Sequence, residues 1–376
     1  MITLLHIIPV ALVLMGLFTT DGLAASSDVS PPIARYSGTP EKIGDEAGQD
    51  DPGRIRSLMR MMTLRTLPAR WFHPQRVASL IAGISTDHRA EIHALARAAS
   101  VSEASMLAAN VLVDSQCSAL VSPASEQQPL RVARNMDFFP ATTLGRRTVL
   151  TIVRPAGKHA FASIGWPGFV GVVSGTNDAG LTACILVNHD SGYVPGGQPI
   201  CFRMREMLEG CATVDEAVAC FAAAPIASSH YVLLADATTS TLVWQGRDGL
   251  VHRDAPHNGW LACSNGRRSV DGLPLDWRGR RLQSLGAGFS CDTVTEADMR
   301  QALTATYLTW INAQAMVFVP ATKTLELAVG GMWHPAACSA WYRIELQPLF
   351  DDQPLSDVTV TTLASVPPLS HPLLIR

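Results

Sequence analysis

Apolar residues follow a helical period in the first third of the chain. Between residues 54 and 110 they recur every three or four positions, as on one face of a helix, at Val77, Leu80, Ile81 and Ile84. The run from Glu91 to Ala99 consists of strong helix formers, and Ser102 is placed to cap a further helix over Glu103–Asn110. Before this region, residues 25–40 predict a loop and the polar residues 44–53 predict turns.

Beyond Cys117 the pattern changes to short apolar runs separated by Gly, Pro or Asn, which predict strands. The expected strands are 149–153, 161–166, 169–174, 181–187, 231–235, 241–245, 315–319, 324–329 and 340–346. Helices are expected at 202–208, from Thr213 to the residues before Pro225, and from Thr295. This order predicts an α+β fold of antiparallel sheets with packed helices, with a helical segment at the N-terminus. Periodicity alone does not distinguish a four-layer αββα sandwich from other α+β arrangements.

The first eighteen residues are almost wholly apolar and are followed by small residues around Ala24 and Ala25. Such a segment predicts a secretory signal peptide over residues 1–25, and hence export to the periplasm or the extracellular space. The alternative is an uncleaved membrane anchor, but the stretch is shorter than the ~20 residues that a spanning helix needs. We therefore expect no stable membrane insertion once the signal is removed.

The 376 residues are 47% hydrophobic and 16% charged, with a formal net charge of −3 and without a run of Lys or Arg. This balance suits a compact enzyme acting on small molecules and argues against nucleic-acid binding.

The eight cysteines show neither Cys-x-x-Cys spacing nor matching His pairs, which argues against structural zinc. His88 and His93 lie five residues apart, on different helix faces, and the sequence contains no His-Glu-x-x-His, phosphate-loop or dinucleotide motif, so we expect no metal and no organic cofactor.

Cys117 is the strongest candidate for chemistry. Arg134 and Asp137 follow within twenty residues, so one segment supplies a thiol, a cation that favours a thiolate, and a carboxylate. The simpler interpretation is a buried core thiol beside a solvated ion pair, because free cysteine is among the most buried residue types.

Further motifs occur in a fixed order around this cluster. They are Tyr36 to Gly44 with Gly48, the helical stretch 91–110, Asn177-Asp178-Ala179-Gly180-Leu181 leading to Asn188, and residues 229–236 followed by Cys263-Ser264-Asn265. Together with Cys-Ser-x-x and Arg-Asn-x-Asp, they resemble the acyl-CoA:isopenicillin N acyltransferase group of N-terminal-nucleophile hydrolases. Choloylglycine hydrolases are more distant relatives. The resemblance covers roughly residues 36 to 330, and no single motif would suffice.

The resemblance implies an αββα sandwich and a precursor that cleaves itself between Gln116 and Cys117. Residues 26–116 would then be a helical propeptide or α chain, and residues 117–376 a catalytic β chain that stays associated with it. A free α-amine, with an ordinary pKa near ~8, serves as the base without any histidine.

The resemblance also implies roles for four further residues. Arg134 would stabilise the thiolate, Asp137 would orient the new amine, and Asn188 and Asn265 would form the oxyanion hole. As separate residues, the two asparagines are better explained as turn or strand-end caps, and it is the order of the motifs that favours the functional role. Two departures from the family pattern are Gln116, where the fungal enzyme has Gly, and Gly266-Arg267-Arg268, where the family often has His.

The expected function is that of an amidohydrolase that cleaves linear, non-peptide carbon–nitrogen amide bonds through a thioester at Cys117. The alternative is an acyltransferase that moves an acyl group from acyl-CoA or another donor to an amine. The apolar candidates for the substrate pocket, each of which core packing would also explain, are Phe138, Phe139, Trp166 and Phe169.

Two rival interpretations remain. One is a papain-like pairing of Cys117 with His189, His230 or His257, for which the papain local signature is absent. The other is an exported binding protein that kept the fold and lost the chemistry.

Overall fold

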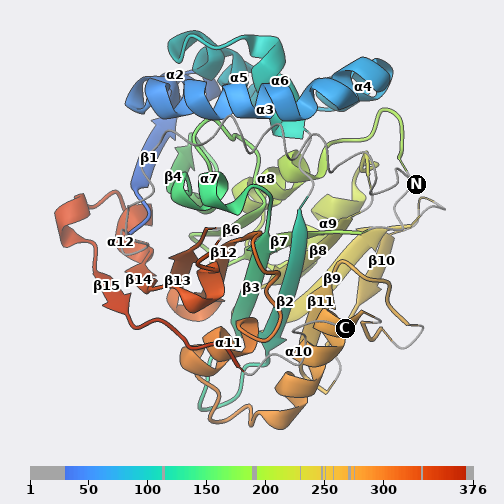
Figure 1. Cartoon of the computed structure of the whole chain (residues 1–376), viewed down its shortest axis with the longest axis vertical. Helices are drawn as coiled ribbons and strands as arrows, with labels where there is room; N and C mark the ends of the chain where they lie inside the picture. Colours follow the sequence, from blue (N-terminus) through green and yellow to red (C-terminus); the bar gives the residue numbers. More distant parts are fainter. Residues whose placement is uncertain are drawn as a thin grey trace.

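The computed structural model describes residues 30–111, 115–188, 193–228, 230–246, 249, 251–256, 258–269, 272–274, 276–331 and 333–369. In these parts of the chain the strands form two sheets (Figure 1). The first has eight strands in the order β1-β4-β5-β6-β7-β8-β9-β10, and the second has seven in the order β11-β2-β3-β12-β13-β14-β15. Neighbouring strands are antiparallel throughout, apart from the parallel pair β1 and β4.

The strands of the eight-stranded sheet are β1 (Ile33–Gly38), β4 (Val149–Pro155), β5 (Phe161–Gly165), β6 (Ser174–Asn177), β7 (Thr182–Val187), β8 (His230–Ala235), β9 (Ser240–Gln245) and β10 (Val251–Asp254). Those of the seven-stranded sheet are β2 (Gln116–Ser122), β3 (Arg131–Asp137), β11 (Leu261–Ser264), β12 (Asn312–Val319), β13 (Thr324–Val329), β14 (Trp341–Glu345) and β15 (Val360–Leu363).

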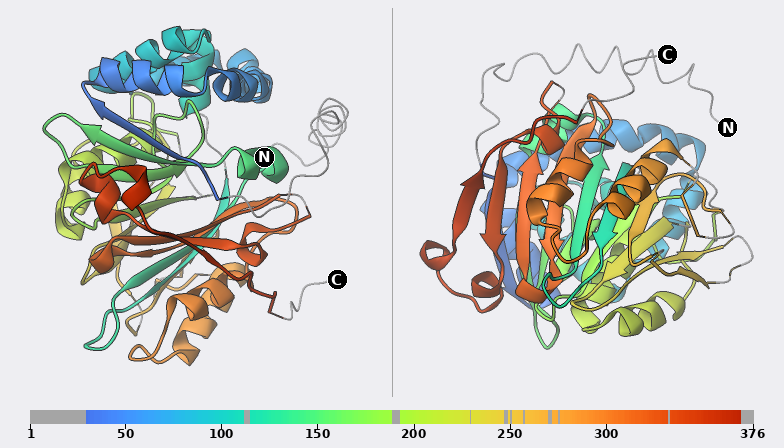
Figure 2. Two further views of the ribbon diagram at one scale, coloured as in Figure 1. Left: turned by 90° about the vertical axis from the view of Figure 1, so that its left-hand side faces the viewer. Right: turned by 90° about the horizontal axis from the view of Figure 1, so that it is seen from below.

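Helices cover the outer face of each sheet, while the two inner faces pack on each other (Figure 2). Over the eight-stranded sheet lie α2 (Pro40–Asp50), α3 (Pro52–Phe72), α4 (Pro74–Ala82), α5 (Thr86–Ala98), α6 (Glu103–Val111), α8 (Ile200–Gly210) and α9 (Val214–Ala222). Against the seven-stranded sheet pack α10 (Trp277–Gly288) and α11 (Glu296–Leu303), while α7 (Ala141–Arg146) and α12 (Gln347–Phe350) lie in connections. The predicted α+β fold with a four-layer αββα order is confirmed.

Several predicted helix starts are confirmed together with their capping residues. Thr213 caps α9 by accepting a hydrogen bond from the backbone of Glu216. Thr295 and Asp298 form a reciprocal capping box at α11. The predicted strands are also found, within a few residues at their ends, apart from the one expected over residues 169–174.

The prediction of turns over residues 44–53, and of a loop before them, was wrong. Residues 33–38 form β1, and residues 40–50 form α2. A Cβ on Gly44 would lie 2.2 Å from the carbonyl oxygen of Glu91, and one on Gly48 would lie 2.6 Å from Cβ of Ala98. These glycines therefore serve the close packing of α2 on α5, a use that sequence alone does not distinguish from a turn.

The strand expected over residues 169–174 is an irregular segment instead. Its backbone N–H groups find hydrogen-bond acceptors that are not in a neighbouring strand. The N–H of Val170 donates to the Asn110 side chain, and the N–H of Val172 donates to the carbonyl of Cys201. The next strand, β6, begins only at Ser174. The apolar run correctly indicated burial, but burial alone does not show that the segment pairs with a neighbouring strand.

None of the helices in the described ranges combines the length and the apolar character needed to span a membrane. The predicted signal peptide, residues 1–25, lies outside the described residues.

Candidate active site

Cys117 is the second residue of β2, and its side chain is fully buried. β2 pairs with β3 on one side and with the edge strand β11 on the other, so Cys117 lies on the second strand of the seven-stranded sheet. Its Sγ lies 3.2 Å from a guanidinium nitrogen of Arg134 and 3.5 Å from the hydroxyl of Ser115. A guanidinium at this distance stabilises a thiolate.

Arg134 bridges the two sheets and is not a surface charge. It extends from β3 and is fully buried, and it donates at 2.6 Å each to the carbonyl of Ile185 in β7 and to that of Val173, just before β6. It also donates to the hydroxyl of Ser174. Burial lowers the pKa of Arg134, but the Cys117 thiol is the first of the neighbours that raise it, and the net direction is upward. The charge is therefore permanent and directed at the sulfur.

Asp137 ends β3 and is buried among hydrogen-bond donors. It accepts from the side chain of Asn312 at 2.8 Å and from the backbone of Leu308 at 3.2 Å, and it lies 3.5 Å from Arg278. Burial raises its pKa to about 6, against the opposing effect of Arg278 and these hydrogen bonds. None of its contacts within the described residues is to the backbone nitrogen of Cys117.

Asn265 is the residue in contact with that nitrogen. It directly follows β11, and its Oδ1 accepts from the N–H of Cys117 at 2.6 Å. Its side-chain nitrogen donates to the carbonyl of Val187 at 2.9 Å, the last residue of β7. An amide nitrogen carries two hydrogens, so one donor of Asn265 remains for a substrate oxygen.

Asn188 comes directly after Val187 and is 6% exposed. Because Asn265 donates to the carbonyl of Val187, the end of β7 lies beside the end of β11. The structure thus brings the backbone next to Asn188 close to Asn265, although the two residues are 77 positions apart in the sequence.

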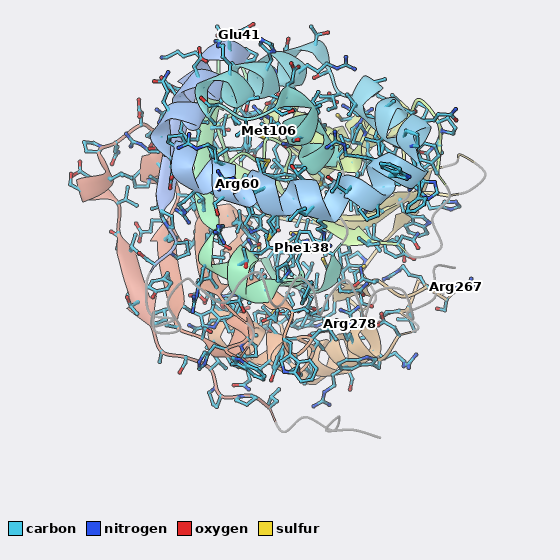
Figure 3. All side chains as sticks on the ribbon, turned by 45° about the horizontal axis from the view of Figure 1, so that its top comes forward. Glu41, Arg60, Met106, Phe138, Arg267 and Arg278 are labelled. Atoms are coloured by element: carbon cyan, nitrogen blue, oxygen red, sulfur yellow. The ribbon has the colours of Figure 1, made fainter. Side chains whose placement is uncertain are left out.

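Arg278 is a further site residue that the sequence analysis missed. It lies in the first turn of α10, is 4% exposed, and donates to Oδ1 of Asn265 at 2.8 Å and to the side chain of Gln116 at 3.3 Å. Asp276 holds it there, because that carboxylate caps α10 and also accepts from the Ser264 hydroxyl and the backbone of Gly266. No feature of the sequence distinguishes Arg278 from its neighbours Arg280 and Arg281. Figure 3 places its label low on the molecule, on the side opposite the N-terminal helices.

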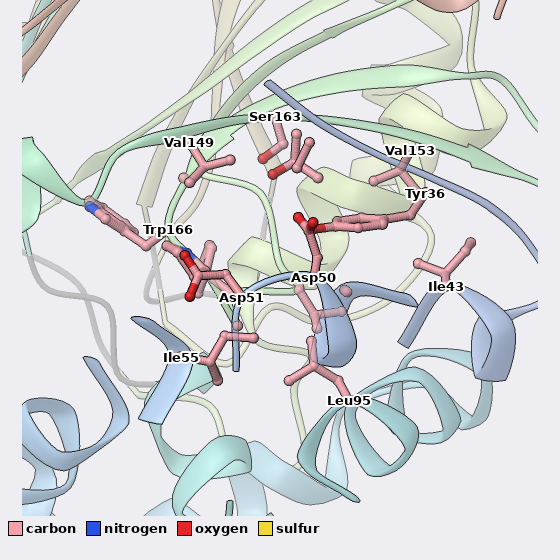
Figure 4. A pocket seen from close by; sticks show the side chains of 18 of the residues that line it. Tyr36, Ile43, Asp50, Asp51, Ile55, Leu95, Val149, Val153, Ser163 and Trp166 are labelled. Carbon is pink, nitrogen blue, oxygen red and sulfur yellow. The ribbon is translucent and has the colours of Figure 1, made fainter. Parts of the chain in front are cut away.

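The predicted pocket residues fall into two groups. Phe138, Trp166 and Phe169 form a row of edge-to-face contacts, with ring centroids 5.5 and 6.0 Å apart. Phe139 is 37% exposed and stands apart. Trp166 and Phe169 also line a cavity of about 310 Å³ between the N-terminal helices and the eight-stranded sheet (Figure 4). Cys117 and Arg134 are not among the residues of the described chain that line it.

Of the histidines proposed for a papain-like pairing, His230 is the one that falls in the described part of the chain. Its Nδ1 lies 3.0 Å from the carbonyl of Ser228, and His189 and His257 lie outside the described residues. In the ranges that the structure describes, no cluster of three or more His, Cys, Asp or Glu residues is arranged to hold a metal.

The chain was compared with curated sequences and with solved structures. The curated protein sequences contain no match to this chain. Among solved structures, similarity is found to a Caenorhabditis elegans N-acylethanolamine-hydrolyzing acid amidase ortholog, at 18% identity and a TM-score of 0.48, covering 54% of this chain and 93% of that one. A variant of the conjugated bile acid hydrolase from Clostridium perfringens is 11% identical, with a TM-score of 0.45, and the match covers 68% of this chain and 98% of that one. Penicillin V acylase from Agrobacterium tumefaciens is 15% identical, with a TM-score of 0.39, and the match covers 68% of this chain and 99% of that one. At such scores these likenesses add nothing to the assignment of the fold, which rests on the two sheets and their helices.

A family model matches part of the chain directly. Residues 124–269 match the model for acyl-coenzyme A:6-aminopenicillanic acid acyl-transferase. This segment contains Arg134, Asp137, Asn188 and Asn265, whereas Cys117 lies seven residues before it. Over residues 124–269, the match agrees with the resemblance that the motifs indicated.

Proposed function

We propose that the protein is an exported, self-processing cysteine amidohydrolase that cleaves linear, non-peptide carbon–nitrogen amide bonds. The observation that carries this proposal is the 3.2 Å contact between Sγ of Cys117 and the buried guanidinium of Arg134. A buried thiol with no functional role would have apolar neighbours, whereas this one faces a fixed positive charge.

Other buried thiols of the chain differ from Cys117 in their surroundings. Burial raises the pKa of Cys184 to about 11 and that of Cys201 and Cys263 to about 12, so these thiols stay protonated near neutral pH. Each is fully enclosed without a direct hydrogen bond from a cation among the described residues. Cys117 is therefore the thiol that we assign as the nucleophile.

The first step is cleavage of the chain itself. Sγ of Cys117 attacks the carbonyl carbon of Gln116, the carbon–nitrogen bond breaks, and the nitrogen leaves with a proton as the α-amine of Cys117. Water then hydrolyses the resulting thioester, giving chains that end at Gln116 and begin at Cys117. The contact from Arg278 to the Gln116 side chain supports this step, because it holds the residue before the scissile bond in place.

The freed amine then serves as the base for substrate turnover. Its nitrogen replaces the amide that now donates to Oδ1 of Asn265, close to Arg278. A neighbouring cation favours the neutral form of an amine, which is the form that accepts a proton. The amine takes the thiol proton, sulfur attacks the substrate carbonyl, and the amine returns the proton to the leaving nitrogen.

The remaining residues stabilise charge in this sequence. Arg134 offsets the thiolate, while Asn188 and the unused N–H of Asn265 face the oxyanion. Asp137, with Arg278 between it and Asn265, keeps the amine site oriented. Water completes the cycle by attacking the thioester and releasing the acid.

Acyl transfer is the second candidate, and the family match favours it. The family is described as an acyl-CoA-dependent acyltransferase, and an amine in place of water would complete transfer by the same residues. Export, which we also propose, argues for hydrolysis because acyl-CoA is scarce outside the cytoplasm.

The experiment is an activity screen of Cys117→Ala beside the wild type and Cys184→Ala. The substrates are N-acyl amino acids, bile-salt conjugates and penicillins, with and without an acyl-CoA. We expect release of a free amine by the wild type and Cys184→Ala but not by Cys117→Ala, with circular dichroism confirming that all three fold. An active Cys117→Ala protein would refute the assignment, and turnover only with acyl-CoA would establish transfer instead of hydrolysis.

A further inference from the structure

The cavity below the N-terminal helices is separate from the proposed active site. Its sheet wall is formed by the alternate residues of β4 and β5 that point outward, such as Thr151 and Ser163. Cys117 and Arg134 lie on the other side of that sheet, in the layer between the two sheets. A ligand in this cavity would therefore not contact the sulfur.

The cavity has the size and the walls of a small-molecule site. Its volume of about 310 Å³ falls at the lower end of the range of roughly 300–1,000 Å³ that ligand pockets occupy. The rings of Tyr36, Phe161, Trp166 and Phe169 contribute to its lining, together with aliphatic side chains from α2, α3 and α5. Figure 4 shows Tyr36, Trp166, Asp50 and Ser163 around one common space.

The mouth of the cavity is negatively charged. Asp50 accepts a hydrogen bond from the Tyr36 hydroxyl at 2.9 Å, and no Lys or Arg of the described residues lies within ion-pair distance of its carboxylate. The carboxylate of Asp51, beside it, lies 3.6 Å from the guanidinium of Arg54, which also lines the cavity, so the negative charge of the mouth rests on Asp50. Burial and the carboxylates of Asp50, Asp51 and Glu46 all raise the pKa of Tyr36 above its ordinary value, which reflects the same negative field.

Deeper in the cavity lining, the charges of Arg205 and Glu91 cancel each other, while Glu209 lies outside the lining and also pairs with Lys158. Arg205 forms two hydrogen bonds to Glu91, at 2.6 and 2.8 Å, and a third to Glu209 at 2.7 Å. Neither Arg205 nor Glu91 is thus available to a ligand as a free charge. Asp50 remains as the carboxylate without a cationic partner in the described part of the chain.

The floor offers a buried hydroxyl. Ser163 is 7% exposed and lines the cavity, and its hydroxyl makes no hydrogen bond to any residue that the structure describes. Its oxygen is accessible from the cavity and is not enclosed by protein atoms, so it can donate to or accept from a bound molecule or water. Its position on β5 places it across the cavity from the helix that carries Asp50.

We propose that this cavity binds a small organic ammonium ion. The protonated amine pairs with Asp50 at the mouth, an apolar or aromatic body fills the space between the rings, and the far end reaches the Ser163 hydroxyl. Aromatic faces attract a cation, and a charged hydrogen bond is about twice as strong as a neutral one, so this lining selects positive over neutral or negative ligands of the same shape.

The test is isothermal titration calorimetry with 2-phenylethylamine, 2-phenylethanol and phenylacetate at pH 7. We expect saturable one-to-one binding of the amine, at least tenfold weaker binding of the alcohol, and no binding of the acid. Asp50→Asn should weaken amine binding about tenfold. Asp45→Asn, on the same helix but outside the cavity lining, is the matched control and should bind as the wild type.

Three results would overturn the proposal: no saturable binding of the amine, equal binding of phenylacetate, or unchanged affinity in Asp50→Asn. The test does not depend on the proposed reaction, because Cys117→Ala is expected to bind the amine as the wild type does.

Discussion

At the scale of single residues, Arg134 connects the sulfur to both sheets. It is fully buried and contacts a thiol of one sheet, a carbonyl of the other sheet, and the carbonyl of Val173 just before β6. The sequence indicated Arg134 and its association with Cys117, since the two stand in one motif. It did not indicate Arg278, because α10 carries three arginines and only the Asp276 cap decides which of them reaches Asn265.

Replacing Arg134 by lysine should impair both catalysis and folding. Lysine keeps the charge but cannot contact Val173, Ile185 and Cys117 at once from a single ammonium group. We expect a loss of at least about 100-fold in kcat/KM and about 2–4 kcal/mol in the free energy of unfolding, measured by steady-state kinetics and urea denaturation. The matched control is Arg253→Lys in an exposed ion pair with Asp215, which should change stability by less than about 1 kcal/mol. Equal behaviour of the two variants would contradict the role of Arg134.

Asp137 should give the protein a specific pH dependence of stability. Its folded pKa of about 6 lies above the ordinary value of 3.8, so the folded state keeps a proton that the unfolded state loses between these pH values. The free energy of unfolding therefore falls as pH rises through this window, by up to about 3 kcal/mol from this group alone. Asp137→Asn removes the titration.

The measurement is the free energy of unfolding of the wild type and Asp137→Asn at pH 4 and at pH 7. The wild type should lose more stability than the variant between the two values. Parallel pH profiles would show that Asp137 is not the group responsible.

At the scale of elements, the sequence predicted what depends on local periodicity and capping. The helices from Thr213 and Thr295 and the strands around residues 182–187 and 324–329 appear where the pattern placed them. The sequence-based prediction failed where contacts with distant parts of the chain determine the local structure. Glycines that predicted turns in α2 serve helix contact, and the apolar run after Phe169 is held by the Asn110 side chain in place of a ladder.

Substitution of Gly44 by alanine tests this account of α2. The added methyl group would lie 2.2 Å from a backbone oxygen of α5, so the two helices must move apart. We expect a loss of about 2 kcal/mol or more in the free energy of unfolding, measured by chemical denaturation. Gly210→Ala, at the end of α8, meets no atom within 4 Å and should be neutral or stabilising by up to about 1 kcal/mol. A Gly44→Ala protein as stable as the wild type would show that α2 does not need this close contact.

At the scale of the whole molecule, the candidate site is assembled from segments that are distant in sequence. β2, β3, the ends of β7 and β11, and α10 each contribute, which is why a single motif did not define the site. The segments before and after Cys117 are also joined by buried charges. Glu91 of α5 pairs with Arg205 of α8, both within 5% exposure.

This pair should hold together the two chains that the proposed cleavage would produce. Arg205→Met would leave Glu91 and Glu209 buried without their shared cation, at a cost of about 3–5 kcal/mol. We expect the two chains of this variant to separate on size exclusion in a urea concentration at which the wild-type chains still co-elute. Lys158→Met, which removes a half-exposed partner of Glu209, is the control and should behave nearly as the wild type. Co-elution of the Arg205→Met chains under the same conditions would contradict this role.

The claim on which the proposed chemistry depends is that Cys117 becomes the first residue of a chain. N-terminal sequencing of purified, catalytically active protein tests it most directly. The account predicts two sequences, one of which begins with Cys117, Ser118 and Ala119. Active protein in which the bond between Gln116 and Cys117 stays intact would contradict it.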